Sequence, residues 1–130
     1  MAEGLFLGTP PGHSWPITAA ALEQHLRQRF PSAPLRAVPA GPTGAPALDF
    51  YLPLADGDTH SGSYSETGVL ALSDGNPELW AETMFWFLNL LPPDEPVYAM
   101  REYHPTPTPV PTEARRDPAA IAMFFDSLPQ

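Results

Sequence analysis

Asp56, Asp58 and His60 lie within one short segment, DGDTH, and these residue types could do chemistry. Two carboxylates and an imidazole at a tight turn could converge on a cation, and oxygen ligands suit Ca²⁺ or Mg²⁺. The match to a calcium loop fails further along, because Ser61 stands in place of its glycine and Thr67 in place of its glutamate. Aspartate and glycine are also the residues that a hairpin tip needs for its backbone. We therefore predict a polar hairpin tip and no metal site.

Residues for nucleophilic catalysis lack the neighbours that such chemistry requires. Ser14 lies in the run GHSWP, which has proline where a nucleophile elbow has its closing glycine. The histidines show no metal-ligand spacing. The chain has neither cysteine nor lysine, which excludes disulfides, thiolate catalysis and Schiff-base chemistry. We therefore predict no catalytic residue and no cofactor.

The negative charge of the chain is concentrated in its middle. The net charge is −9, and no basic residue occurs between Arg36 and Arg101. That stretch holds nine acids, namely Asp49, Asp56, Asp58, Glu66, Asp74, Glu78, Glu82, Asp94 and Glu95. Such a field repels nucleic acid and anionic lipid and attracts basic proteins. Solubility is the alternative explanation for a charge of this size.

The segment 77–91 predicts an unusually apolar helix. Asn76 suits its N-cap and Pro77 its first position, and the body contains Trp80, Trp86 and Phe87. A helix that is apolar all round is usually buried. A domain of this size rarely covers a helix on every side, however, so some aromatics could form a protein-binding patch.

Two further helices and an antiparallel sheet complete the predicted fold. Thr18 as N-cap and the spacing of Leu22 and Leu26 indicate a helix over 18–30, and Asp117 with Pro118 begins one over 118–128. Alternating apolar residues predict a β-meander over 47–73, and a further strand is expected over 97–103. Residues 104–111 alternate proline with other residues, which suggests an extended strap. The order favours a single α+β domain over 1–130 with its helices on one face.

Neither a membrane span nor a signal peptide is expected. No window approaches the roughly 20 apolar residues that a spanning helix needs, and the N-terminus lacks a basic region before an apolar run. We expect a cytoplasmic protein with no membrane or nucleic-acid partner.

Our first functional hypothesis from these patterns is that the chain is a non-enzymatic protein-binding module. An acidic face would cover a basic partner, in the manner of an inhibitor or immunity-type protein that blocks a basic toxin. The expected contact residues are five acids that steer the encounter and three aromatic anchors: Asp56, Asp58, Glu66, Glu78, Glu82, Tyr64, Trp80 and Trp86.

Two alternatives remain open at this point. One is an enzyme or small-ligand binder with a pocket between sheet and helices, in which His60, Asp58 or His104 would be the acid–base groups. The other is a homodimer, which would bury the same surplus of apolar side chains.

Overall fold

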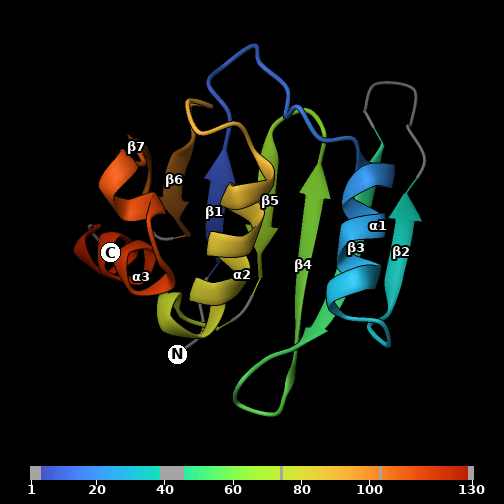
Figure 1. Ribbon diagram of the computed structural model, residues 1–130. Helices are drawn as coiled ribbons and strands as arrows, with labels where there is room; N and C mark the ends of the chain where they lie inside the picture. Colours follow the sequence, from blue (N-terminus) through green and yellow to red (C-terminus); the bar gives the residue numbers. More distant parts are fainter. Residues whose placement is uncertain (1–3, 39–45, 74, 103, 129–130) are drawn as a thin grey trace.

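The computed structural model describes residues 4–38, 46–73, 75–102 and 104–128. It confirms the α+β class (Figure 1). The elements in chain order are β1 (Leu5–Gly8), α1 (Ala19–Arg29), β2 (Leu35–Val38), β3 (Ala47–Pro53), β4 (Thr59–Ser65), β5 (Val69–Leu72), α2 (Pro77–Leu90), β6 (Tyr98–Arg101), β7 (His104–Pro109), a short 3-10 helix η1 (Thr112–Arg115) and α3 (Pro118–Ser127).

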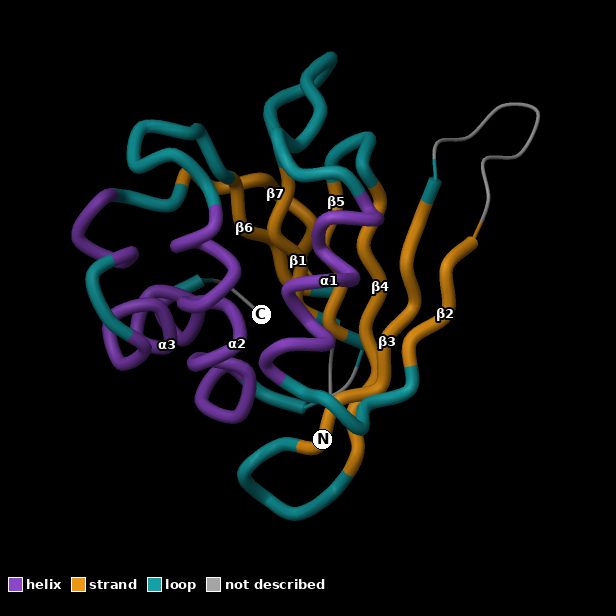
Figure 2. The backbone as a smooth tube through the Cα atoms, turned by 45° about the vertical axis from the view of Figure 1, so that its right-hand side comes forward, coloured by secondary structure: helices purple, strands orange, loops and turns teal. Residues whose placement is uncertain are grey.

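The strands form one antiparallel sheet in the order β2-β3-β4-β5-β1-β6-β7. The first strand of the chain thus lies between β5 and β6, well inside the sheet. All three helices lie on the same face, with α1 over the β2–β3 side and α3 over the β6–β7 side (Figures 1 and 2). The opposite face of the sheet is not covered by any of the described elements.

The predicted caps begin the three helices. The side chains of Thr18, Asn76 and Asp117 accept hydrogen bonds from backbone amides three residues ahead, at 3.0, 2.8 and 2.8 Å. Each cap satisfies one amide that the helix itself cannot pair. The helices therefore begin and end within about two residues of the predicted bounds.

The core lies between the sheet and the helices. Alternate strand residues such as Leu48, Phe50, Leu52 and Leu72 are buried on the covered face. Helix α2 supplies the largest share of the opposing layer, with Trp80, Met84, Phe87 and Leu88 all buried. Burial of this apolar surface is the main stabilising contribution to such a fold.

Gly62 is required by the close packing of β3 against β4. A Cβ at this position would lie 2.4 Å from the Phe50 ring and 2.9 Å from the backbone oxygen of Ala71. Phe50 and Gly62 are cross-strand partners on the covered face. The absent side chain therefore leaves the space that the Phe50 ring fills.

The expectation of a proline strap after β6 was wrong, because this segment is the edge strand β7. Val110 donates its amide to the Val97 oxygen at 2.9 Å, so its backbone nitrogen points toward β6. The direction alternates along a strand, and the nitrogen of the neighbouring Pro109 therefore points away from β6, out of the sheet edge. Proline is tolerated on an edge because no partner there needs its missing amide, and it prevents another strand from adding.

Two arginines hold the C-terminal part of the chain to the sheet. Arg101 on β6 is buried and donates to the Phe125 oxygen at 2.8 Å, near the end of α3. Arg115 in η1 donates to the Glu95 backbone oxygen at 2.7 Å. Burial lowers the pKa of Arg115, and the negative charges of Glu95 and Asp94 partly offset that effect. No helix within the described ranges is long and apolar enough to cross a membrane.

Candidate protein-binding surface

One side of α2 faces away from the sheet and carries both acids and aromatic rings. We call this set the α2 stripe: Glu78, Glu82, Phe85, Trp86 and Asn89. A spacing of four, three, one and three residues keeps all five within about one quarter of the helix circumference. Glu78, Glu82 and Asn89 are exposed, while the two aromatic side chains are half-buried. The helix thus buries its other aromatic residues and leaves this row at the surface.

Arg29, the last residue of α1, reaches the α2 stripe. Its guanidinium carbon lies 5.6 Å from the centroid of the Trp86 ring and 5.5 Å from that of Phe30. Both distances are within the range of cation–π attraction, which is about 0.5–1 kcal/mol at exposed sites. The arginine therefore joins the exposed ends of α1 and α2 into one surface.

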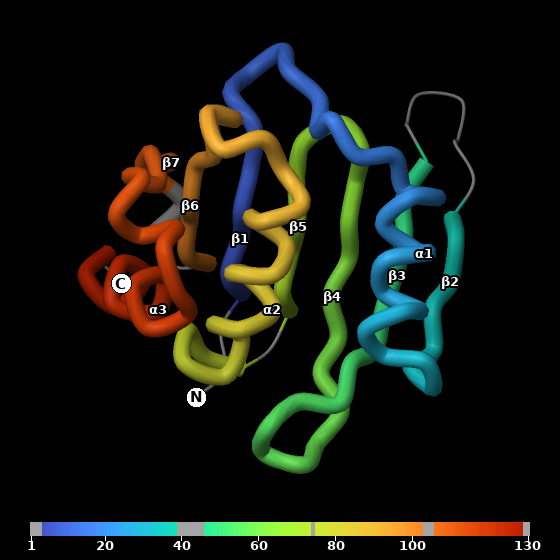
Figure 3. The backbone as a smooth tube through the Cα atoms, in the orientation of Figure 1, coloured from blue at the N-terminus to red at the C-terminus, as the bar shows by residue number. Residues whose placement is uncertain are grey.

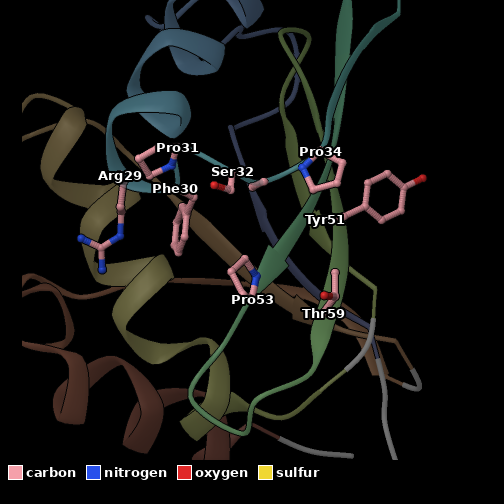
Figure 4. Close-up of a pocket in the computed structure, with 9 residues that line it drawn as sticks. Arg29, Phe30, Pro31, Ser32, Pro34, Tyr51, Pro53 and Thr59 are labelled. Carbon is pink, nitrogen blue, oxygen red and sulfur yellow. The ribbon is translucent and has the colours of Figure 1, made fainter.

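Two hollows flank this arginine. The first has a volume of about 380 Å³ and is lined by Arg29, Glu82, Phe85, Trp86, Asn89 and Pro118. The second has a volume of about 430 Å³ and lies beside the end of α1, next to the chain that enters β2. Figure 4 shows Phe30 and Pro53 in this second hollow, with Arg29 extended toward α2 and Tyr51 pointing to the other side of the strand. Neither hollow is lined by histidine or aspartate, so neither one assembles the acid–base groups of the enzyme hypothesis.

Tyr64 and Trp80 were expected to contact a partner, and the structure contradicts this because both side chains are completely buried. The Tyr64 hydroxyl donates to the Ile17 backbone oxygen, and its ring packs against both Trp15 and Phe87, which also contact each other. Burial raises the pKa of Tyr64 far above its usual range, and the charge of Glu66 adds to this effect. Both residues belong to the core, and of the predicted anchors only Trp86 reaches the surface.

Asp56 and His60 form a pair at the β3–β4 turn. The Asp56 carboxylate accepts from the Asp58 amide at 3.0 Å and lies 2.8 Å from Nε2 of His60. These hydrogen bonds, the amide first, lower the pKa of Asp56. The His60 ring in turn packs edge-on against Trp80, with 6.1 Å between centroids. The pair therefore holds the hairpin against the start of α2.

The DGDTH segment is accordingly a hydrogen-bonded turn. Within the described ranges, no three histidine, aspartate or glutamate side chains are grouped as a metal site would require. The side chain of His104 lies outside the described residues.

The predicted acids do not share one face. Figure 3 shows the β3–β4 turn, with Asp56 and Asp58, at the same end of the sheet as the start of α2, and the β4–β5 turn, with Glu66, at the opposite end. Glu66 also has a structural role there, because it accepts from the Ala19 amide at 2.8 Å. The continuous acidic face expected over 49–95 is therefore wrong, since one antiparallel strand, β4, separates its members by the length of the sheet.

Glu78 is paired with another acid. Helices α2 and α3 pack together, and a hydrogen bond with Asp126 raises the pKa of Glu78 above its usual value. Two carboxyl groups at hydrogen-bond distance repel each other when both are ionised. A cation placed beside them would relieve that repulsion.

Sequence reasoning missed Arg29, Phe30 and Phe85 as members of this surface. Phe30 continues the apolar spacing of the first helix and so resembles a core residue. Arg29 follows an ordinary polar pattern on the same helix. No signal within either segment indicates that the two helix ends meet, because their contact joins residues more than 50 positions apart.

Comparison of the chain with known protein families, with curated proteins and with solved structures finds no significant match. The surface must therefore be interpreted from its own geometry.

Proposed function

We propose that this chain is a non-enzymatic protein-binding domain that contacts a basic partner through the α2 stripe and Arg29. The observation that carries the proposal is the position of Trp86, which is half-buried and lines one hollow, with the Arg29 guanidinium of both hollows 5.6 Å from its ring. Tryptophan and arginine are the residue types most enriched among interface hot spots. The two hollows that Arg29 lines provide space for side chains of a partner.

The charge around Trp86 supports a basic partner. Glu78, Glu82 and the neighbouring Asp126 are exposed, and Glu78 and Asp126 lie within hydrogen-bond distance of each other. The net charge of −9 adds a long-range attraction for a positively charged protein. An inhibitor of a basic toxin, of the immunity type, is a concrete partner relationship that has this charge pattern.

The proposal is tested by capturing partners from cells of the source organism with tagged wild-type chain, Trp86→Ala and Met123→Ala. Met123 is a matched control because it is the most exposed large apolar side chain among the described residues and lies on α3. Truncation of a hot-spot tryptophan costs about 2 kcal/mol or more, so we expect at least tenfold less of a basic protein on Trp86→Ala and no loss on Met123→Ala. Equal recovery by all three chains contradicts the proposed surface.

The electrostatic part is tested separately with the purified partner. Association rate constants measured at rising salt should fall, because salt screens steering between opposite charges. A rate that does not change with salt contradicts the basic-partner assignment while leaving the Trp86 surface in place.

A further inference from the structure

The face of the sheet opposite the helices is unusually poor in charge. Its strand positions follow from the register, because Phe6 pairs with both Ala71 and Met100, and Ala71 pairs with Ser63. An exposed antiparallel face normally carries polar, often charged, residues at alternate positions. Here the outward residues of β5, β1 and β6 are Val69, Ala71, Phe6, Gly8, Tyr98 and Met100.

Charged side chains on this face occur, within the described strands, only on β2 and β3. Within the described strands the outward-facing charges are Arg36 on β2 and Asp49 on β3, and these two pair with each other at 3.5 Å. Glu102 lies beyond the end of β6, in the turn toward β7. The centre of the face is thus neutral on a chain whose net charge is −9. Depletion of charged residues at the centre of a surface is typical of a protein interface.

The exposed apolar side chains indicate the same face. Of the three large apolar residues that are well exposed in the described part of the chain, Tyr51 and Val69 point outward from the sheet here, at 43% and 39% exposure. The outward residues of β4 between them are polar but uncharged, namely Thr59, Ser61, Ser63 and Ser65.

We infer that this face is the contact between two copies of the chain. A basic partner would find only Asp49 on it, and Arg36 already pairs with that carboxylate. An acidic partner would likewise find only Arg36 on the described strands of this face, and Arg36 is already paired. A partner for this face must therefore present an uncharged surface of matching shape. The same face of a second copy is such a surface.

The face is complementary to itself in shape. The outward residues of its β3–β4 half are mostly small, including Ala47, Ser63 and Ser65, with Tyr51 near the β3–β4 turn as the large exception, whereas its β1–β6 half carries Phe6, Tyr98 and Met100. A two-fold axis along the central strand β5 would place β1 of one copy over β4 of the other, and β6 over β3.

This arrangement sets specific large side chains against small ones. Phe6 would lie over Ser63 of the second copy, Tyr98 over its Ala47 and Met100 over its Asp49, while Ala71 would face its own counterpart. Sheets that pack face to face interdigitate such side chains about 10 Å apart.

The available area fits a reversible dimer. Seven strands of four to seven residues span roughly 30 by 17 Å, or about 1,000 Å² over two copies, at the usual strand spacings. That is close to the smallest area of a specific interface. The two copies also repel each other through their net charges, and salt screens that repulsion.

Sedimentation velocity over a range of protein concentrations, up to about 500 μM, tests the inference at low and high salt. We expect particles of twice the 14.1 kDa chain mass at high concentration, with tighter dimerisation at high salt. This salt effect is opposite to that expected for a basic partner, so failure of one proposal is distinguishable from failure of the other.

Ala71→Glu should weaken dimerisation at least tenfold, because each new carboxylate would face its counterpart across the axis. Met123→Glu adds the same charge to the opposite layer of the molecule and should dimerise like the wild type. Val69→Glu is the second variant, at a more exposed position, and circular dichroism checks that each variant is folded. A wild type that stays at the mass of one chain under all conditions overturns the inference, as does undiminished dimerisation of both sheet variants.

Discussion

Glu66 accepts a hydrogen bond from the Ala19 amide at 2.8 Å, so the β4–β5 turn caps the first turn of α1. The two residues are 47 positions apart. An anionic side chain at this place satisfies an unpaired amide and complements the positive end of the helix dipole. Helix α1 is therefore held at its start by both Thr18 and a distant carboxylate.

Glu66→Ala should lower the free energy of unfolding by about 1–2 kcal/mol, as loss of a helix cap does. Urea denaturation monitored by circular dichroism measures this change. Glu82→Ala removes an exposed acid from the α2 stripe and should change stability by less than about 0.5 kcal/mol. If the two variants are equally stable, Glu66 does not have the structural role assigned to it.

Tyr64→Phe should destabilise the fold by about 1–3 kcal/mol, because the buried Ile17 oxygen loses its donor. The same variant should alter the response to alkaline pH. The pKa of Tyr64 is raised in the folded state, so above a pH of about 10 the unfolded chain releases a proton that the folded chain keeps. Wild-type stability should therefore fall as the pH rises past that value, and Tyr64→Phe should show a smaller decline. Denaturation curves at several alkaline pH values would contradict this if the two declines were equal.

Acrylamide quenching of fluorescence tests the exposure of Trp86. Trp15 and Trp80 are 5% and 0% exposed, whereas Trp86 is half-buried at the surface. We expect one readily quenched component in the wild type and its loss in Trp86→Phe. Quenching that persists in Trp86→Phe would show that another indole is accessible and would weaken the proposed surface.

Asp126→Asn should return the pKa of Glu78 toward its ordinary value, because it removes the carboxyl group that shares a hydrogen bond with Glu78 and repels it when ionised. In the wild type, the raised pKa means that the folded chain keeps a proton on Glu78 at pH values where the unfolded chain has released it. The contribution of this pair to the free energy of unfolding therefore falls as pH rises through the range in which carboxyl groups titrate. The variant should lose this pH dependence. Its free energy of unfolding near neutral pH should rise by at most about a few tenths of a kcal/mol, since the site is exposed. Carboxyl carbon NMR titration measures the pKa, and Asp94→Asn, in the loop after α2, should leave it unchanged.

Local patterns were sufficient to predict the helices and the meander. The caps of Thr18, Asn76 and Asp117 act over three residues, and the alternation in β3 follows from the two-residue period of a strand. Both signals are contained in a short stretch of chain, which is why they can be read without the fold. The β7 segment was missed because the same prolines permit an extended strap or an edge strand, and only pairing with β6 distinguishes the two.

The composition of the chain by itself determined its acidity and its lack of thiol and lysine chemistry, and the order of its helix and strand patterns predicted the α+β class. Only the tertiary structure decided that Tyr64 and Trp80 are core residues while Trp86 meets Arg29, and that Glu66 lies at the opposite end of the sheet from Glu78. The physical reason is that burial and proximity depend on contacts between segments distant in sequence. A periodic pattern shows which side chains share a face, but strand order and helix placement determine what that face contacts.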